Sequence, residues 1–368
     1  MTERFIPPHF RPLPEGKGET AAYTQTLHLQ ASPSSTHFSH QSEKIAIPPF
    51  KPAWWCRNPH LQTLWPVFFR RHLRPSLRRE RLEIPDGDFV DLDWTLNSTG
   101  PIVVLFHGLE GGRRSHYARA MLDVLPRHGY RVVLMHFRGC SGEPNRLPCA
   151  YHSGDTGDID FLIRTLKQRE PRTPVAAIGY SLGGNALLKW LGEQGAQAPV
   201  CCAVAVSIPF LLQDSSAYLN RGFSKIYQRH LMRSLKAGVR RKAERFPPPV
   251  PLNEVDAMQS FFDFDNRITG PVHGFRGAQH YYSASSSRQF LQRIRIPTLI
   301  VHSSDDPFMP ASVIPQDGEL SASITFALQT HGGHVGFVSG NNPLNPHYWL
   351  DSTLPQWLKQ SISTTVRV

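Results

Sequence analysis

The stretch VAAIGYSLGGNALLKWLGEQG (residues 175–195) changes from an apolar run to a helical pattern at a serine set among glycines. Residues 175–180 are predicted to form a buried strand, because apolar side chains follow one another with no charged residue between them. Residues 182–195 repeat apolar side chains at helical spacing and are predicted to form a helix. The chain must therefore turn sharply at Ser181, and only small residues such as Gly179 and Gly183 allow the two elements to approach so closely.

Residues 179–183 fit the pattern G-x-S-x-G, and the strand before them and the helix after them supply the context that this pattern requires. The turn lifts the hydroxyl group of Ser181 above the end of the strand, at the positive end of the helix dipole. We therefore predict that Ser181 is a catalytic nucleophile rather than an incidental serine in a glycine-rich turn.

Strands and helices alternate on both sides of this turn. Predicted strands lie at 89–94, 101–108, 131–137, 201–207, 298–303 and 324–330, and predicted helices at 115–129, 158–170 and 345–361. Short apolar strands separated by amphipathic helices indicate an α/β fold with a mostly parallel central sheet and helices on both faces. A polar, largely helical insertion at about 208–292 interrupts this alternation, and we expect it to form a cap that shapes an apolar acyl pocket.

A serine hydroxyl group is a poor nucleophile unless a histidine takes its proton and a carboxylate fixes the tautomer of that histidine. In this kind of fold the order along the chain is serine, acid, histidine. The strand at 324–330 leads to His331 and His334. We expect His334 to be the base, because the two glycines before it form a flexible turn that can swing the imidazole over the sheet.

The strand at 298–303 leads to two candidate acids, Asp305 and Asp306. The spacing of Asp306 from Ser303 and from Pro310 matches the pattern of many hydrolases with this triad, which favours Asp306. Asp305 remains the alternative, and the acid that is not used is expected to hydrogen-bond the backbone of its loop.

Negative charge that develops on a substrate carbonyl oxygen requires backbone N–H donors. The amide of Leu182, next to the nucleophile, is one expected donor. The other is expected from the glycine-containing loop HGLEGG (residues 107–112), where we predict the amide of Leu109. His107 precedes a glycine at a strand end and is expected to order this loop rather than to act as a base.

The composition narrows the function further. The chain has 368 residues, a formal net charge of +11 and five cysteines without C-x-x-C spacing, so neither a disulfide framework nor a zinc site is indicated. No metal or cofactor is expected, and Asp155, Asp158 and Asp160 are predicted to cap a helix rather than to bind a cation. No recognised nucleic-acid motif accompanies the positive charge, so nucleic acid is not an expected partner.

Two basic runs, at 70–82 and 221–245, carry much of the charge. The second is predicted to form one amphipathic helix or two, docked on the core with a solvated basic face. Contact of that face with an anionic membrane is the alternative. Residues 1–45, rich in Pro, Ser, Thr and Gln, are predicted to be a flexible extension, and residues 46–368 the folded domain. Because neither a secretory signal nor an apolar run of spanning length is present, we expect a cytoplasmic protein, soluble or peripheral to a membrane.

Together these residues resemble the AB hydrolase-4 family of the α/β-hydrolase superfamily, which includes YheT-type hydrolases and ABHD1/ABHD3-type lipases. The resemblance covers about residues 48–360 and is carried by the motifs NPHLQTLWP (58–66), HGLEGG (107–112), FRGCSGEPN (137–145), GDTGDI (154–159), GYSLGGNALLKWLGE (179–193), DFDNRITGPVHGF (263–275), YYSASS (281–286), DDPFMP (305–310) and GGHVGF (332–337). It implies an α/β-hydrolase fold whose triad is carried by Ser181, Asp305 or Asp306, and His334.

The resemblance also implies a carboxylic ester hydrolase that acts on short-chain esters, acylglycerols or phospholipid acyl chains. Two alternatives stay open at this point. An acyltransferase would use an alcohol in place of water on the same acyl-enzyme, and a binding module would keep the scaffold without the reaction. The sequence does not indicate the physiological ester or the oligomeric state.

Overall fold

The computed structural model describes residues 45–96 and 99–366. The extension predicted at 1–45 lies outside these residues, apart from Ile45. The central sheet has eight strands in the order β1-β2-β4-β3-β5-β6-β7-β8. The strands are β1 (Leu77–Glu83), β2 (Phe89–Thr95), β3 (Ile102–Phe106), β4 (Arg131–Met135), β5 (Val175–Tyr180), β6 (Cys202–Val206), β7 (Thr298–Ser303) and β8 (Ile324–Gln329).

In sheet order the strands from β4 to β8 pair in parallel, and β2 runs antiparallel to both of its neighbours, β1 and β4. The predicted α/β-hydrolase fold with a mostly parallel sheet is therefore confirmed. Because parallel strands end at one edge, the loops after β3, β5, β6, β7 and β8 all leave the sheet on the same side. The segments that contain the predicted site residues follow these strands.

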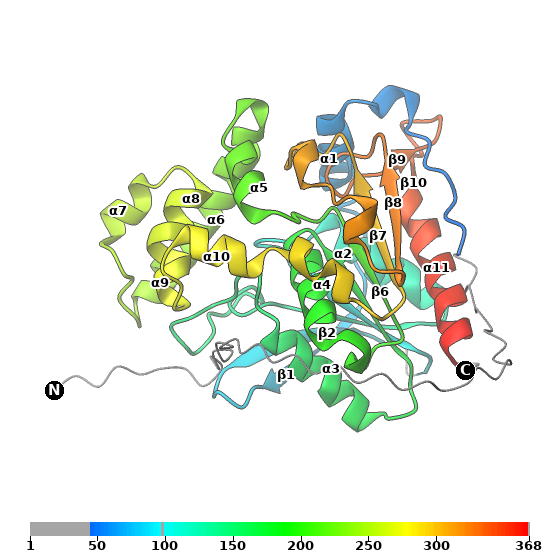
Figure 1. Cartoon of the computed structure of the whole chain (residues 1–368), viewed down its shortest axis with the longest axis horizontal. Helices are drawn as coiled ribbons and strands as arrows, with labels where there is room; N and C mark the ends of the chain where they lie inside the picture. The colour runs from blue at the N-terminus through cyan, green and yellow to red at the C-terminus, as the bar shows by residue number, and fades with distance from the viewer. Residues whose placement is uncertain (1–44, 97–98, 367–368) are drawn as a thin grey trace, which may run out of the picture. The chain divides into compact units, whose positions relative to one another are not determined.

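Helices cover both faces of the sheet (Figure 1). On one face, α3 (Gly157–Arg169) and α4 (Leu182–Gln194) pack their apolar side chains into a cluster that includes Trp190. On the other face, α2 (His116–Arg127) and α11 (Trp349–Val366) build a second cluster that includes Trp357. Strands buried on both faces explain why their sequences are continuously apolar instead of alternating.

Two elements were not predicted from the sequence as the structure shows them. The basic run at 70–82 contains strand β1, in which Arg79 and Arg81 form ion pairs with Asp93 and Asp91 on β2 at 2.8 and 2.9 Å. Cross-strand pairing neutralises this part of the charge run, which the sequence pattern did not reveal. The last helix begins at Trp349 rather than at residue 345, because His347–Tyr348 (β10) pairs with Val338–Ser339 (β9).

The segment between β6 and β7 is largely helical and stands beside the sheet in Figure 1. Its longest helix, α6 (Lys225–Ala243), shows that the basic run at 221–245 forms one main helix. The other helices of this insertion are α5 (Leu212–Leu219), α7 (Leu252–Ala257), α8 (Phe261–Phe264), α9 (Gly270–Val272) and α10 (Ala278–Ser285). No helix of the described chain is both long enough and apolar enough to cross a bilayer.

Several enclosed histidines make the stability of this fold depend on pH. Burial lowers the pKa of His107, His116 and His152 to about 3 and that of His302 to about 4. Between these values and the ordinary value of about 6.5, the unfolded chain binds protons that the folded chain does not. The contribution of these imidazoles to the free energy of unfolding therefore decreases as the pH falls below about 6.5.

We predict that His302→Leu flattens this dependence. His302 is buried and its Nδ1 has no hydrogen-bond partner, so leucine can replace it without leaving a polar group unsatisfied. In denaturant unfolding, the dependence of the unfolding free energy on pH between pH 6 and pH 5 should have a slope smaller than that of the wild type by nearly one proton, or about 1.2 kcal/mol per pH unit. Equal slopes for the two proteins would contradict this account of the buried imidazoles.

Candidate active site

Ser181 occupies the turn between β5 and α4 with φ 51° and ψ −118°. A residue other than glycine rarely adopts a positive φ, and such a conformation costs about 1–3 kcal/mol. The amide of Ser181 donates to the carbonyl oxygen of Val206 at 2.9 Å, which ties the turn to the end of β6. The neighbouring strands therefore hold the serine in its strained conformation.

Close backbone contacts on both sides of Ser181 explain the glycines of the motif. A Cβ atom at Gly183 would lie 2.5 Å from the carbonyl oxygen of His107, and one at Gly179 would lie 2.6 Å from that of Gly183. Both distances are shorter than any contact that a side chain could tolerate. The helix α4 can thus start directly against the end of β3 only because no side chain intervenes.

His334 lies in the loop after β8 and meets Asp306 from the loop after β7. Its Nδ1 is 2.8 Å from Oδ2 of Asp306, and both side chains are buried or nearly so. Phe308 stacks on the imidazole with ring centroids 3.9 Å apart and an interplanar angle of 5°. A hydrogen bond at Nδ1 leaves Nε2 as the ring nitrogen available for proton transfer.

Asp305, the alternative acid, points to a different partner. Its carboxylate lies 3.2 Å from Nδ1 of His331 and accepts the amide of Gly333 at 3.0 Å. His331 is 44% exposed, whereas His334 lines the cavity that contains Ser181. Asp306 rather than Asp305 therefore contacts His334, and Asp305 braces the backbone of the same loop.

Four further hydrogen bonds fix the loop that carries His334. Its own amide donates to Oγ1 of Thr63 at 2.9 Å, and the amide of Val335 donates to Oγ of Ser207 at 3.0 Å. Oγ of Ser303 donates to the carbonyl oxygen of Gly333 at 2.7 Å, and the amide of Phe337 donates to that of Gly332 at 3.0 Å. Contacts from separate strands and from α1 (Pro59–Phe69) thus position the imidazole.

Backbone strain in the described chain is concentrated on this edge of the sheet. The residues other than glycine with positive φ are Glu110, Ser181, Ser207, Val335 and Phe337. All of them belong to the loops that follow β3, β5, β6 and β8. Strained conformations of this kind cluster where a protein holds reactive groups in place.

The loop after β3 presents an amide without an internal partner. The amide of Gly108 donates to the hydroxyl of Tyr117, and the amide of Glu110 donates to the hydroxyl of Tyr151, each at 2.8 Å. Between them, the amide of Leu109 makes no hydrogen bond to any described residue, and neither does that of Leu182. Both leucines line the same cavity as Ser181.

His107 helps to set the direction of the Leu109 amide. The carbonyl oxygen of Gly108 lies 2.7 Å from Nδ1 of His107 and accepts the amide of Gly111 at 2.9 Å. In a trans peptide the C=O and N–H groups point in opposite directions, so holding this oxygen turns the Leu109 N–H away from it. Nε2 of His107 accepts the amide of Phe137, and burial lowers its pKa to about 3, consistent with a neutral ring that orders the loop.

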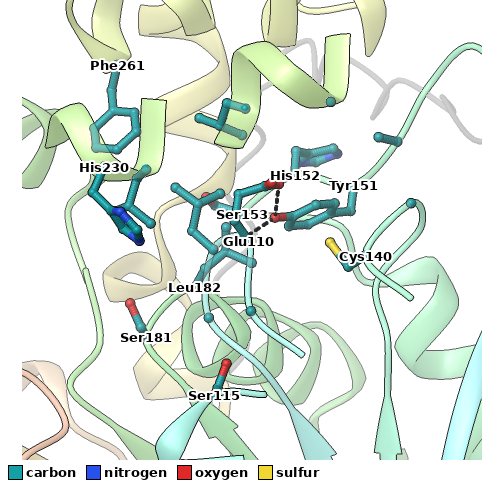
Figure 2. A pocket seen from close by; sticks show the side chains of 18 of the residues that line it. Glu110, Ser115, Cys140, Tyr151, His152, Ser153, Ser181, Leu182, His230 and Phe261 are labelled. Atoms are coloured by element: carbon teal, nitrogen blue, oxygen red, sulfur yellow. Dashed lines mark hydrogen bonds between the residues drawn. The ribbon is translucent and has the colours of Figure 1, made fainter. Parts of the chain in front are cut away.

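One cavity of about 1410 Å³ joins these groups to the insertion. Figure 2 shows Ser181 and Leu182 in it together with His230 and Phe261 of the insertion. One face of α6 lines the cavity over its whole length, from Ile226 to Lys242. Elsewhere the wall from the insertion combines apolar side chains, including Leu219, Phe261, Phe264, Ile268 and Val272, with polar ones, including Ser216, Asp265, Thr269, His273 and Tyr282.

Polar groups at the wall are mostly engaged with each other. Tyr151 donates to the carboxylate of Glu110 at 3.1 Å, as Figure 2 shows, and burial raises the pKa of that carboxyl group. Arg138 pairs with Asp158 at 2.7 Å, so this aspartate contacts a guanidinium group rather than the helix backbone that the sequence predicted. In the described part of the chain, no group of three or more His, Cys, Asp or Glu side chains is arranged to hold a metal ion.

Several contributors to this site were not found from the sequence. Thr63 and Phe308 lie in motifs that carry the family resemblance, but neither they nor Tyr117 and Tyr151 were predicted to contact His334 or the Leu109 loop. Their positions depend on contacts between segments far apart in the chain. Only the tertiary structure could reveal them.

Comparisons with known proteins give a consistent result. A family model described as the alpha/beta hydrolase fold matches residues 101–340. The esterase-type protein YheT of Escherichia coli is 43% identical over 330 residues, which cover 88% of this chain and 95% of that protein. Phospholipase ABHD3 of Homo sapiens is 28% identical over 324 residues, which cover 85% of this chain and 79% of that protein.

Two further matches extend the comparison. Monoacylglycerol lipase of Saccharomyces cerevisiae is 30% identical over 268 residues, which cover 70% of this chain and 59% of that protein. Among solved structures, an esterase of Pyrococcus furiosus has a TM-score of 0.50 at 16% identity and covers 88% of this chain and 98% of its own. At that identity the likeness to the solved structure is one of fold alone.

We predict that Gly183→Ala disrupts the turn at Ser181. The added methyl group would meet backbone oxygens of Phe106 and His107 that cannot move without displacing β3. Thermal unfolding should show a loss of stability of about 1–3 kcal/mol, the usual range for overpacking. Gly157→Ala is the matched control, because its nearest neighbour is 3.9 Å away and alanine favours the helix there. Equal melting temperatures for the two variants would refute the packing argument.

Proposed function

Because this chain belongs to the AB hydrolase-4 family of alpha/beta hydrolases and is an esterase- or lipase-type hydrolase by homology, we propose that it cleaves carboxylic esters with Ser181 as its nucleophile. The proposed triad is Ser181, His334 and Asp306. The observation that carries it is the 2.8 Å contact between His334 and Asp306 beside the cavity that Ser181 lines.

The proposed reaction begins when Nε2 of His334 takes the hydroxyl proton of Ser181 while Oγ bonds to the ester carbonyl carbon. The amides of Leu109 and Leu182 donate to the resulting oxyanion. Collapse of this intermediate breaks the ester C–O bond, and His334 returns the proton to the departing alcohol. Water, deprotonated by His334, then attacks the acyl-enzyme and releases the acid with Ser181 restored.

Asp306 has two proposed roles in these steps. Its contact with Nδ1 holds the tautomer that leaves Nε2 free, and its negative charge stabilises the imidazolium that forms. Phe308 packs flat on the imidazole and restricts its rotation. The ring can then exchange protons with Ser181 and with the leaving group without leaving its position.

The cavity is large enough to hold a long acyl chain. Its walls in the insertion include a cluster of leucine, isoleucine, valine and phenylalanine side chains, against which a hydrocarbon chain can pack. We therefore propose lipid-like esters, with the acyl chain lying against α6 and α8. The insertion at 208–292 would in this proposal act as the cap over the site.

We predict that Ser181→Ala lowers kcat for a panel of p-nitrophenyl esters by about 10⁴-fold or more. The wild type should react with a fluorophosphonate at one site, and the variant should not. Comparison across acyl chain lengths tests the proposed pocket, and product analysis with an added alcohol distinguishes a hydrolase from an acyltransferase. Full activity in the Ser181→Ala variant would overturn the proposed mechanism.

The two neighbouring aspartates provide a sharper test. Asp306→Asn should lower kcat by about 10⁴-fold, because the histidine loses the carboxylate that fixes its tautomer. Asp305→Asn removes a brace worth about 1 kcal/mol and should lower kcat by less than about tenfold. The reverse order of effects would show that Asp305 is the acid of the triad.

A further inference from the structure

The helix α1 buries polar side chains and exposes apolar ones. Its buried residues are Gln62, Thr63 and Pro66, whereas its exposed residues are mainly apolar. Exposed fractions are 47% for Leu61, 54% for Phe68 and 56% for Phe69. A helix of a soluble protein normally shows the opposite arrangement, because exposed apolar surface is unfavourable in water.

The polar side of α1 is buried for a structural reason. The side-chain amide of Gln62 donates to the carbonyl oxygens of Cys56 and Val338 and accepts the amide of Val338, and Thr63 accepts the amide of His334. These contacts explain which residues face the domain. They do not explain why the opposite side carries leucine, valine and phenylalanine instead of polar side chains.

The apolar surface continues onto the insertion. The ring of His60 lies 4.2 Å from that of Phe223 and its Nδ1 is 3.0 Å from the hydroxyl of Tyr227. Phe223 and Ile226, at the start of α6, are about half exposed. We call this surface the entry face and define its apolar part as Leu61, Val67, Phe68, Phe69, Phe223 and Ile226.

Unpaired cations surround the apolar part of the entry face. The segments 45–79, 111–122 and 215–243 contain no Asp or Glu. Within the described chain, none of the following side chains forms an ion pair: Arg71, Arg74, Arg113, Arg114, Lys225 and Arg229. Arg119 of α2 donates to the carbonyl oxygen of Arg71 at 3.3 Å, which brings the segments of Arg71 and Arg113 together.

The entry face is also the rim of the catalytic cavity. Val67, Arg74, Arg113, Phe223 and Ile226 line the same cavity as Ser181. A molecule that rests on this face therefore lies at the opening through which a substrate reaches the serine. This relation links the unusual exposure of α1 to the site.

We propose that the entry face docks on an anionic lipid bilayer. Its aromatic and aliphatic side chains enter the boundary between headgroups and acyl chains, and its cations contact lipid phosphates. A second copy of this chain fits less well, because a symmetric pair would bring the same cations together. Docking does not depend on the chemical step, so it can be tested apart from the proposed function.

This proposal moves the membrane contact from the whole basic face of α6 to its start. Farther along the helix, Arg240 pairs with Asp256, and Lys242 donates to the carbonyl oxygens of Leu147, Pro148 and Cys149. These cations already have partners in the folded chain. Lys225 and Arg229, near Phe223 and Ile226, do not have ion-pair partners among the described residues.

Flotation of the full chain with vesicles tests the proposal. The wild type should bind phosphatidylcholine vesicles that contain phosphatidylglycerol, should bind pure phosphatidylcholine vesicles much less, and should be released by high salt. Leu61→Ser with Phe68→Ser should weaken binding at least tenfold, because two apolar anchors are lost. Arg74→Gln with Arg113→Gln should weaken it about fivefold for each cation removed.

Matched controls separate docking from folding and from catalysis. Leu328→Ser changes a leucine of similar exposure on β8, and Arg172→Gln removes an exposed arginine at the opposite end of β5; both should bind like the wild type. Leu61 and Phe68 do not line the cavity, so their double variant should hydrolyse a water-soluble ester at the wild-type rate.

Three results would overturn the proposal. These are failure of the wild type to bind anionic vesicles, equal binding to neutral and anionic vesicles, and retention of binding by both double variants. A dimer in sedimentation experiments that dissociates on Leu61→Ser with Phe68→Ser would show that a second copy covers the face instead. If the Ser181→Ala variant loses ester hydrolysis but still binds vesicles, the docking proposal stands. If the wild type does not hydrolyse esters, that result contradicts only the proposed function.

Discussion

The contact between the start of α4 and the end of β3 is the constraint on which the rest of the site depends. Gly183 lies so close to the backbone of Phe106 and His107 that no side chain fits between them. This contact forces the sharp turn at Ser181 and places the Leu182 amide beside the loop of Leu109. The proposed nucleophile and the proposed oxyanion donors therefore share one rigid junction of two parallel strands and a helix.

A second feature is that polar side chains from other parts of the chain form hydrogen bonds with backbone groups of the loops that contain His334 and Leu109. Thr63, Ser207 and Ser303 bond the loop of His334, while Tyr117, Tyr151 and His107 bond the loop of Leu109. Each of these bonds satisfies a group that a turn would otherwise leave without a partner. Rigid loops of this kind need little rearrangement during a reaction, which is the basis of electrostatic preorganisation.

The helix α1 connects these hydrogen-bonded loops to the protein surface. Because Gln62 and Thr63 bind backbone groups of the loop that carries His334 and of Val338, the polar side of the helix must face inward. The apolar residues are then directed outward, next to cations that have no ion-pair partner in the described chain. One helix thus supports the histidine loop and forms part of the rim of the cavity.

Local pattern was sufficient for the fold and for the turn at Ser181. Continuous apolar strands and helical periodicity predicted the mostly parallel sheet, because both follow from which side chains must be buried. The pattern failed where charges pair across strands, as Arg79 and Arg81 do in β1. It also missed the short pairing of β9 with β10, which shifts the start of the last helix.

By itself, the sequence determined the order of the elements and the segments that leave the sheet on one side, since these depend on residues close together in the chain. Only the tertiary structure decided which neighbour contacts which. Asp305 and Asp306 are adjacent in sequence, but one meets His331 and the other His334, because successive residues direct their side chains differently. The inverted burial of α1 was likewise decided by backbone groups of a loop more than two hundred residues away, which no local pattern contains.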